Sequence, residues 1–184
     1  MLQLAFVGAI TGRYVDFTSA QHAALAMVAE RQGIALDEEG ARRIVSAMRT
    51  LPPHGDVPDA LTLLGDGGFT LAALTNSPLE VVDDQLRNAG LHARFDAILS
   101  ADQVRALKPR PEPYELAART FDVPLAGVRL VAAHAWDVAG ALAAGCRAAF
   151  VARPGMVLSP VGPRPDIVGT DVGEVAERIL ELDR

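Results

Sequence analysis

The chain has 184 residues, 50% of them hydrophobic and 22% charged, which suits a folded domain and argues against a mainly disordered chain. Its net charge of -6 offers no basic surface to a phosphate backbone, so we expect a small-molecule ligand and no nucleic acid. The single cysteine, Cys146, excludes an internal disulfide and fits a cytoplasmic protein, and no apolar run reaches the roughly 20 residues of a membrane-spanning helix.

The first third of the chain is predicted to be helical. Residues 1–10 are apolar and lack a basic flank, and we expect them to form a helix that faces a partner surface. Ser19 is placed to cap a second helix that ends before Gly33. Asp37 is placed to open a third helix, which runs to Leu51 and stops before two prolines.

The proline pair marks a change of pattern. We place there the boundary between a partial helical cap, residues 1–53, and an α/β core, residues 54–184. Beyond it, short apolar runs alternate with helical patterns, which is typical of a parallel sheet covered by helices. The predicted strands are Phe69–Leu74, Ala97–Leu99, Val128–Ala133 and Ala148–Val151, and the predicted helices lie near 57–65, 78–89, 111–121, 137–144 and 171–182.

Polar residues follow the first of these strands. Because open parallel sheets bind ligands beyond the carboxyl ends of their strands, Thr75 and Asn76 are candidate site residues. Ser77 and Pro78 then read as the N-cap and first residue of the next helix, whose backbone amides can hold an anion. The alternative is that Thr75 and Ser77 only cap and turn the chain.

A lysine lies in a proline-rich loop after the second strand. Three prolines stiffen residues 106–114 and hold the ammonium group of Lys108 in one direction. A lysine beside a carboxylate nucleophile lowers the pKa of that carboxylate and offsets negative charge that develops on the substrate. In isolation, Lys108 also fits a solvated surface position and Tyr114 a core position.

Three residues of interest lie together directly after the third predicted strand. They are a histidine, the only tryptophan and an acidic residue. His134 is suited to hydrogen-bond a substrate carboxylate, Trp136 to wall an apolar pocket, and Asp137 to orient Lys108 or a water molecule. The competing interpretations are that Asp137 is a helix N-cap and that His134 is a structural histidine.

Taken together, these segments resemble one known family. The string Leu74-Thr-Asn76, Lys108-Pro-x-Pro-x-x-Tyr114, His134-Ala-Trp-Asp137-Val-Ala-Gly-Ala and Phe150-Val-Ala-Arg-Pro-Gly155 is similar to type II haloacid dehalogenases of the L-2-haloacid type, within the haloacid dehalogenase superfamily. Arg13-Tyr-Val-Asp-Phe17 resembles the cap subdomain of that family. The likeness covers nearly the whole chain.

The resemblance implies a Rossmann-like parallel sheet with a helical cap. It also implies hydrolytic dehalogenation of a short 2-haloalkanoic acid through an aspartyl ester, without a cofactor. It assigns catalysis to Thr75, Lys108 and Asp137, and substrate binding to Asn76, Tyr114, His134, Trp136 and Phe17.

One departure from the superfamily bears on the reaction. Its phosphatases usually carry an additional acid four residues before the one that matches Asp137, which completes an oxygen site for Mg²⁺. Here Ala133 takes that place, so no metal site is expected. A magnesium-dependent phosphatase is therefore the less favoured alternative.

A second departure concerns the nucleophile. The family places an aspartate in an Asp-x-x-Gly-Thr-like motif at the end of its first, central strand, and neither is found before Asp16. Asp16 has no buried strand before it and is not a candidate. We therefore expect an N-terminally truncated protein, from a shortened gene product or a misplaced start codon, that is inactive as it stands. The remaining alternative is a non-catalytic fragment that forms a homodimer or binding module through residues 2–10 and open sheet edges.

Overall fold

A computed structural model describes residues 2–183, and of residue 2 it describes only the backbone. The predicted start of the first helix at Met1 and the last residue of the predicted core, 184, lie outside the described residues. The helices are α1 (Leu2–Thr11), α2 (Phe17–Arg31), α3 (Glu38–Ser46), α4 (Val57–Asp66), α5 (Leu79–Asn88), α6 (Pro111–Thr120), α7 (Ala135–Ala144) and α8 (Val172–Leu182). The strands are β1 (Ala72–Thr75), β2 (Ala97–Ser100), β3 (Arg129–Ala132), β4 (Arg147–Val151) and β5 (Ile167–Gly169).

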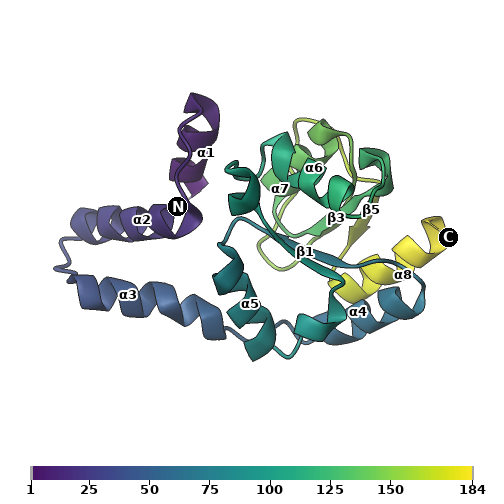
Figure 1. The fold of residues 1–184 in the computed structure, drawn as a ribbon, viewed down its shortest axis with the longest axis horizontal. Helices are drawn as coiled ribbons and strands as arrows, with labels where there is room; N and C mark the ends of the chain where they lie inside the picture. Colours follow the sequence, from purple (N-terminus) through teal and green to yellow (C-terminus); the bar gives the residue numbers. More distant parts are fainter. Residues whose placement is uncertain (1, 184) are drawn as a thin grey trace.

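The three helices of the cap precede the α/β core, and α2 and α3 project away from it as an antiparallel pair (Figure 1). The prediction that Ser19 caps α2 is wrong. The cap is Asp16. Its carboxylate accepts hydrogen bonds from the backbone N–H of Ser19 at 2.9 Å and from the Ser19 hydroxyl at 2.6 Å. The helix therefore begins at Phe17, whose ring packs into the junction between cap and core. None of the helices within residues 2–183 has the length and apolar character needed to cross a bilayer.

The third helix begins as predicted and ends early. Asp37 caps α3 by accepting the backbone N–H of Gly40 at 2.7 Å. The α-helix stops at Ser46, and the chain continues as a 3-10 turn, η1 (Ala47–Thr50). Leu51 is extended, as the residue before a proline prefers to be, so the helix tightens before it breaks.

All strand pairs in the core are parallel, as the alternating pattern predicts. They form two separate sheets: β1 pairs with β2, and β3, β4 and β5 pair in that order. No strand within residues 2–183 is hydrogen-bonded to both β1 and β3. The sequence analysis missed β5, because three residues after a long proline-containing loop give too short a pattern to recognise.

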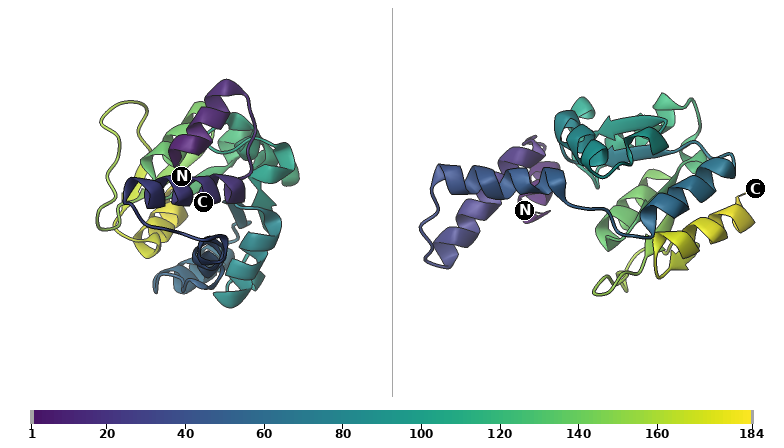
Figure 2. Two further views of the ribbon diagram at one scale, coloured as in Figure 1. Left: turned by 90° about the vertical axis from the view of Figure 1, so that its left-hand side faces the viewer. Right: turned by 90° about the horizontal axis from the view of Figure 1, so that it is seen from below.

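Helices cover both faces of the three-stranded sheet (Figures 1 and 2). On one face, α4 and α8 lie side by side and pack Leu64 and Ile179 against Val151 and Ile167. On the other face, α6 and α7 lie against each other and bury the ring of Tyr114. This packing fixes the carboxyl end of β3 and the start of α7, where polar groups gather.

Candidate active site

A buried ion pair lies beyond the carboxyl ends of β1 and β3. Lys108, the only lysine of the chain, donates from Nζ to Asp137 Oδ2 at 2.7 Å and to the carbonyl of Leu74 at 3.0 Å. The two side chains are only 9% and 7% exposed. Charges removed from water to this extent require close partners, so the pair fixes the loop that carries Lys108 against the first turn of α7.

The second carboxylate oxygen of Asp137 is held by a tyrosine. The Tyr114 hydroxyl donates to Asp137 Oδ1 at 2.7 Å from a ring that is 1% exposed. Burial raises the pKa of Tyr114, and the charge of Asp137 raises it further, so the hydroxyl stays protonated and donates. Asp137 does not cap α7: the helix begins at Ala135, after His134.

Asn76 holds the backbone on either side of the Lys108 side chain. Its Oδ1 accepts the N–H of Lys108 at 2.8 Å, and its Nδ2 donates to the carbonyl of Lys108 at 3.2 Å. The side chain is buried. These two bonds join the end of β1 to the lysine loop, which gives Asn76 a positioning role.

Thr75 keeps a hydrogen available. Its Oγ1 accepts the backbone N–H of Ser77 at 3.1 Å, and within residues 2–183 the hydroxyl donates to no acceptor. The prediction that Ser77 caps the next helix is wrong, because the N-cap is Pro78 and α5 begins at Leu79. The carbonyl of Ser77 instead accepts the hydroxyl of Ser100 at 2.7 Å, which ties together the ends of β1 and β2.

Aromatic side chains pack together at the start of α7, directly before Asp137 in the chain. The Trp136 ring packs edge-on against Phe6 of α1, with 5.9 Å between centroids, and lies 5.8 Å from the His134 ring. The indole Nε1 of Trp136 is buried and has no acceptor within the described residues. Phe6 was not among the predicted site residues, because its immediate neighbours in α1 are apolar or small and nothing singles it out.

Phe17 lies in a different cluster from the one expected. It packs with Tyr14 against Ala5, Ala101 and Leu107, at the junction of cap and core. Because Leu107 precedes Lys108, this packing supports the lysine loop from the side of the cap.

Gly140 lets α7 approach the lysine loop closely. A Cβ atom at this position would lie 2.5 Å from Cβ of Pro109 and 2.7 Å from the hydroxyl of Tyr114. Any side chain there would displace one of them. Ala133, the position of the additional acid in the phosphatases, packs its methyl group against the core.

The site therefore combines a buried ammonium group, its carboxylate and hydroxyl partners, and an aromatic wall. An ammonium group in such a place binds and stabilises an anionic reactant, and the wall suits a short carbon chain. Lys108, Asp137, Tyr114 and Asn76 are in direct contact, and His134 and Trp136 lie together at the start of α7.

Comparisons with known proteins identify the family. A sequence profile described as haloacid dehalogenase-like hydrolase matches residues 17–151. Haloacetate dehalogenase H-2 of Moraxella sp. (strain B) is 32% identical over 90% of this chain and 74% of its own length. The (S)-2-haloacid dehalogenase of Pseudomonas sp. (strain YL) is 32% identical over 96% of this chain and 76% of its own length.

Solved structures agree with this match. L-2-haloacid dehalogenase from Xanthobacter autotrophicus with chloropropionic acid covalently bound superposes with a TM-score of 0.91 at 28% identity, over 100% of this chain and 83% of that one. The fold and site define an α/β hydrolase with a helical cap. The chain belongs to the haloacid dehalogenase-like hydrolases, which confirms the family predicted from the motifs.

Proposed function

We propose that this protein is of the enzyme type that releases halide from a short 2-haloalkanoic acid through an aspartyl ester. The observation that carries the proposal is the buried ammonium group of Lys108, held by Asp137 and Leu74, with Trp136 directly before Asp137 in the chain. The names of the relatives, which are haloacetate and 2-haloacid dehalogenases, support the same reaction.

The reaction needs two displacements. A carboxylate oxygen attacks the carbon that bears the halogen, the carbon–halogen bond breaks, and halide leaves with the electron pair. A water molecule then adds to the ester carbonyl and gives up a proton, and the hydroxy acid leaves as the carboxylate is regenerated. Lys108 offsets the charge of the attacking carboxylate, Asp137 orients Lys108 and the water, and Tyr114 supports Asp137. Thr75 and His134 hold the substrate carboxylate.

The attacking carboxylate is not one of the residues that form this centre. Asp16 caps α2, and the one Asp-x-x-Gly-Thr string of the sequence, Asp166–Thr170, begins before β5, where Asp166 pairs with Arg129 at the amino ends of the strands. We therefore expect the chain by itself to bind a 2-haloacid and to turn it over at no more than trace rate.

Trp136, the only tryptophan, reports on binding. Its fluorescence should change saturably on titration with 2-chloropropionate at fixed ionic strength, and far less with propionate. Lys108→Gln should abolish the response, and Arg87→Gln, which removes an exposed pair with Asp83, should preserve it. An unchanged titration in Lys108→Gln, or rapid chloride release by the unaltered chain, would contradict the proposal.

One assay distinguishes the proposed dehalogenase from a phosphatase of the same superfamily. Hydrolysis of p-nitrophenyl phosphate should stay at the uncatalysed rate with and without magnesium chloride, because Ala133 replaces a charged ligand. Magnesium-dependent phosphate release would favour the alternative.

We also propose that two copies of the protein form a homodimer through their caps. We further propose that the protein is cytoplasmic. Val7, Ile10, Ile34 and Ile44 are 51% to 85% exposed on α1, after α2 and on α3, which is unfavourable for a monomer. Burial raises the pKa of the Cys146 thiol, and a single cysteine suits a reducing compartment. Light scattering over a range of concentrations should give twice the chain mass; a monomer throughout would rule out the dimer.

A further inference from the structure

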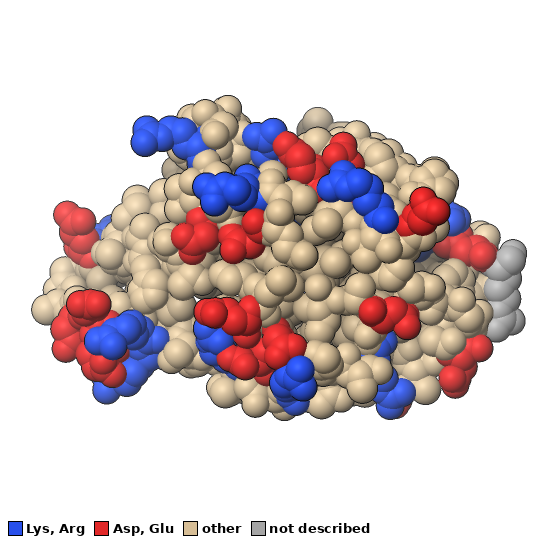
Figure 3. All heavy atoms as spheres, in the orientation of Figure 1, with Lys and Arg blue, Asp and Glu red and all other residues tan. Residues whose placement is uncertain are grey.

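A small pocket lies between α1 and the loop that leads to Lys108. Its volume is about 30 Å³, and it is lined by residues of α1, by residues 12–15 and by residues 105–107 and 110. Arg13, Arg105 and Arg110 line it, and we call it the arginine pocket. Basic side chains gather around α1 at the upper left of the face in Figure 3.

The arginine pocket has an uncompensated positive charge. None of its lining residues is acidic. Arg110 pairs with Glu112, whereas the guanidinium groups of Arg13 and Arg105 make no ion pair and no hydrogen bond within residues 2–183. Arg13 and Arg105 are exposed residues, so an anion can reach both guanidinium groups, whose donors have no protein acceptor within residues 2–183.

Arg105 is held in place before any ligand arrives. Its guanidinium carbon lies 4.8 Å from the centroid of the Tyr14 ring, and the Tyr14 hydroxyl donates to the carboxylate of Asp102. The backbone of Arg105 is left-handed, with φ 49°, which is unfavourable for a side chain of this size. Strain of this kind persists where the surrounding structure requires it, and it is concentrated at functional sites.

The end of α1 opposes an anion only weakly. The helix ends at Thr11, so the negative end of its dipole faces this region. That end is equivalent to about half an elementary charge, against the full charges of Arg13 and Arg105. The local acids are already engaged, since Asp16 caps α2 and Asp102 accepts from Tyr14.

We propose that the arginine pocket binds one halide ion, chloride or bromide, separately from the centre at Lys108. The centre of a water-sized sphere can move through about 30 Å³ of the pocket, more than the roughly 10–15 Å³ that one water needs, so a single-atom anion fits. Because Arg13 follows α1 and Arg105 belongs to the core, the ion bridges the two and stabilises the docking of the cap. This site goes beyond the proposed reaction and does not depend on it.

Chloride titration of the full chain tests the site. Chloride should raise the melting temperature saturably over sodium gluconate of equal ionic strength, and it should broaden the ³⁵Cl resonance. Arg13→Gln and Arg105→Asn should each weaken chloride binding at least about ten-fold, and asparagine tolerates the left-handed backbone. The matched control is Arg42→Gln, an exposed arginine of α3 paired with Glu39, which should respond like the unaltered chain.

Three results would overturn the proposal. The first is identical melting in chloride and gluconate. The second is a chloride response of the Arg13→Gln, Arg105→Asn double variant equal to that of Arg42→Gln. The third is a response that survives in this double variant and disappears in Lys108→Gln, which would place the halide at the other centre. Loss of 2-chloropropionate binding with an intact chloride response would count against the proposed reaction alone.

Discussion

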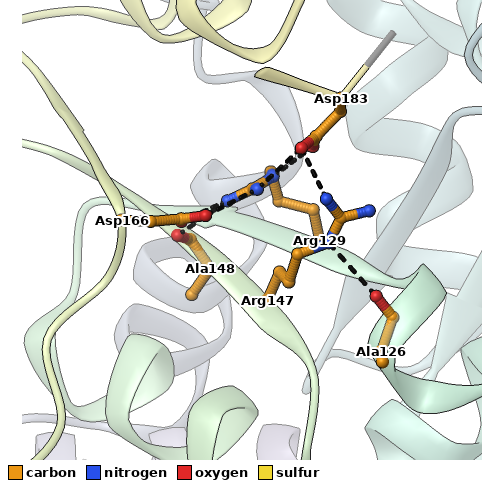
Figure 4. Close-up of polar contacts among 6 residues, drawn as sticks. All are labelled: Ala126, Arg129, Arg147, Ala148, Asp166 and Asp183. Atoms are coloured by element: carbon orange, nitrogen blue, oxygen red, sulfur yellow. Dashed lines mark hydrogen bonds and ion pairs between the residues drawn. The ribbon is translucent and has the colours of Figure 1, made fainter.

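Two buried ion-pair networks lie at opposite ends of the parallel strands. At the carboxyl ends, Lys108 pairs with Asp137. At the amino ends, Arg129 and Arg147 begin β3 and β4, face each other in register, and both reach Asp183 after α8 (Figure 4). Both networks contain a carboxylate that is less than a tenth exposed, and they differ in how completely their donors are used.

Arg129, the buried arginine of the network at the amino ends, has all of its donors engaged. Arg129 donates to Asp183 from Nε at 2.6 Å, to Asp166 from the second terminal nitrogen at 2.9 Å, and to the carbonyl of Ala148 at 3.1 Å. Arg147 donates to the carbonyl of Ala126 at 3.1 Å and also pairs with Asp183. The network fastens α8 and the strand before it, and it leaves Arg129 no donor for a ligand.

The lysine network at the carboxyl ends is incomplete. An ammonium group has three hydrogens, and Lys108 has two acceptors within residues 2–183. The hydroxyl hydrogen of Thr75 and the indole N–H of Trp136 are also without acceptors there. The comparison teaches that the unfilled donors, more than the buried charge itself, distinguish a candidate active site from a structural fastening.

The largest expected effect is the removal of the shared carboxylate. Asp183→Ala should lower the free energy of unfolding by about 3–5 kcal/mol, because it removes the buried carboxylate shared by Arg129 and Arg147 and leaves Arg129 paired with Asp166 alone. Urea denaturation measures this, and the exposed neighbour Glu181 provides the control variant Glu181→Ala. The 2-chloropropionate titration should be unchanged; a loss of binding equal to that of Lys108→Gln would remove the distinction between the two networks.

Asp137→Asn should cost somewhat less stability and, unlike Asp183→Ala, should remove ligand binding. At pH 7 we expect a loss of about 3 kcal/mol, because the substitution leaves the buried ammonium group of Lys108 without a counter-charge. Urea denaturation and the 2-chloropropionate titration, with Asp183→Ala alongside, measure this contrast. Unchanged affinity for 2-chloropropionate in Asp137→Asn would contradict it.

Asn76→Ala tests the positioning of the lysine loop. The substitution leaves the buried N–H and carbonyl of Lys108 unpaired, which should cost about 1–3 kcal/mol and weaken ligand binding. Asn88→Ala is the control, because Asn88 donates to the carbonyl of Arg49 from an exposed position. Full affinity for 2-chloropropionate in Asn76→Ala would show that the loop needs no such support.

The smallest effect concerns acid stability. The hydrogen bond from Arg129 holds the pKa of Asp166 below its usual range, so the stabilisation is present above the unfolded pKa, about 3.9, and is lost as pH falls through the folded value. Asp166 is 50% exposed, so Asp166→Asn should cost no more than about 1 kcal/mol at pH 7. This difference should disappear as the solution is acidified, and denaturation between pH 7 and pH 2 measures it. A difference that grows in acid would be contrary to this sign.

Local rules in the sequence predicted much of the fold. Asp37 caps a helix, and the apolar runs at 97–99 and 148–151 are strands, because capping and side-chain alternation depend on neighbours in the chain. The motif string around Lys108 predicted the family. The choice of Asp16 over Ser19 as a cap was not resolved locally, since both residue types cap helices and only the structure shows that the helix begins at Phe17.

The sequence by itself determined the family, the helical cap, the parallel sheet and the residue types available for chemistry. Only the tertiary structure decided which groups meet, because Lys108 and Asp137 are 29 residues apart and Asn76 and Lys108 are 32 apart. Partners at such separations depend on the path of the whole chain, which no local pattern records. Arg105, unpaired beside Tyr14, and Arg129, with all of its donors engaged beside Asp183, are the same residue type and differ in the acceptors that the fold places around them.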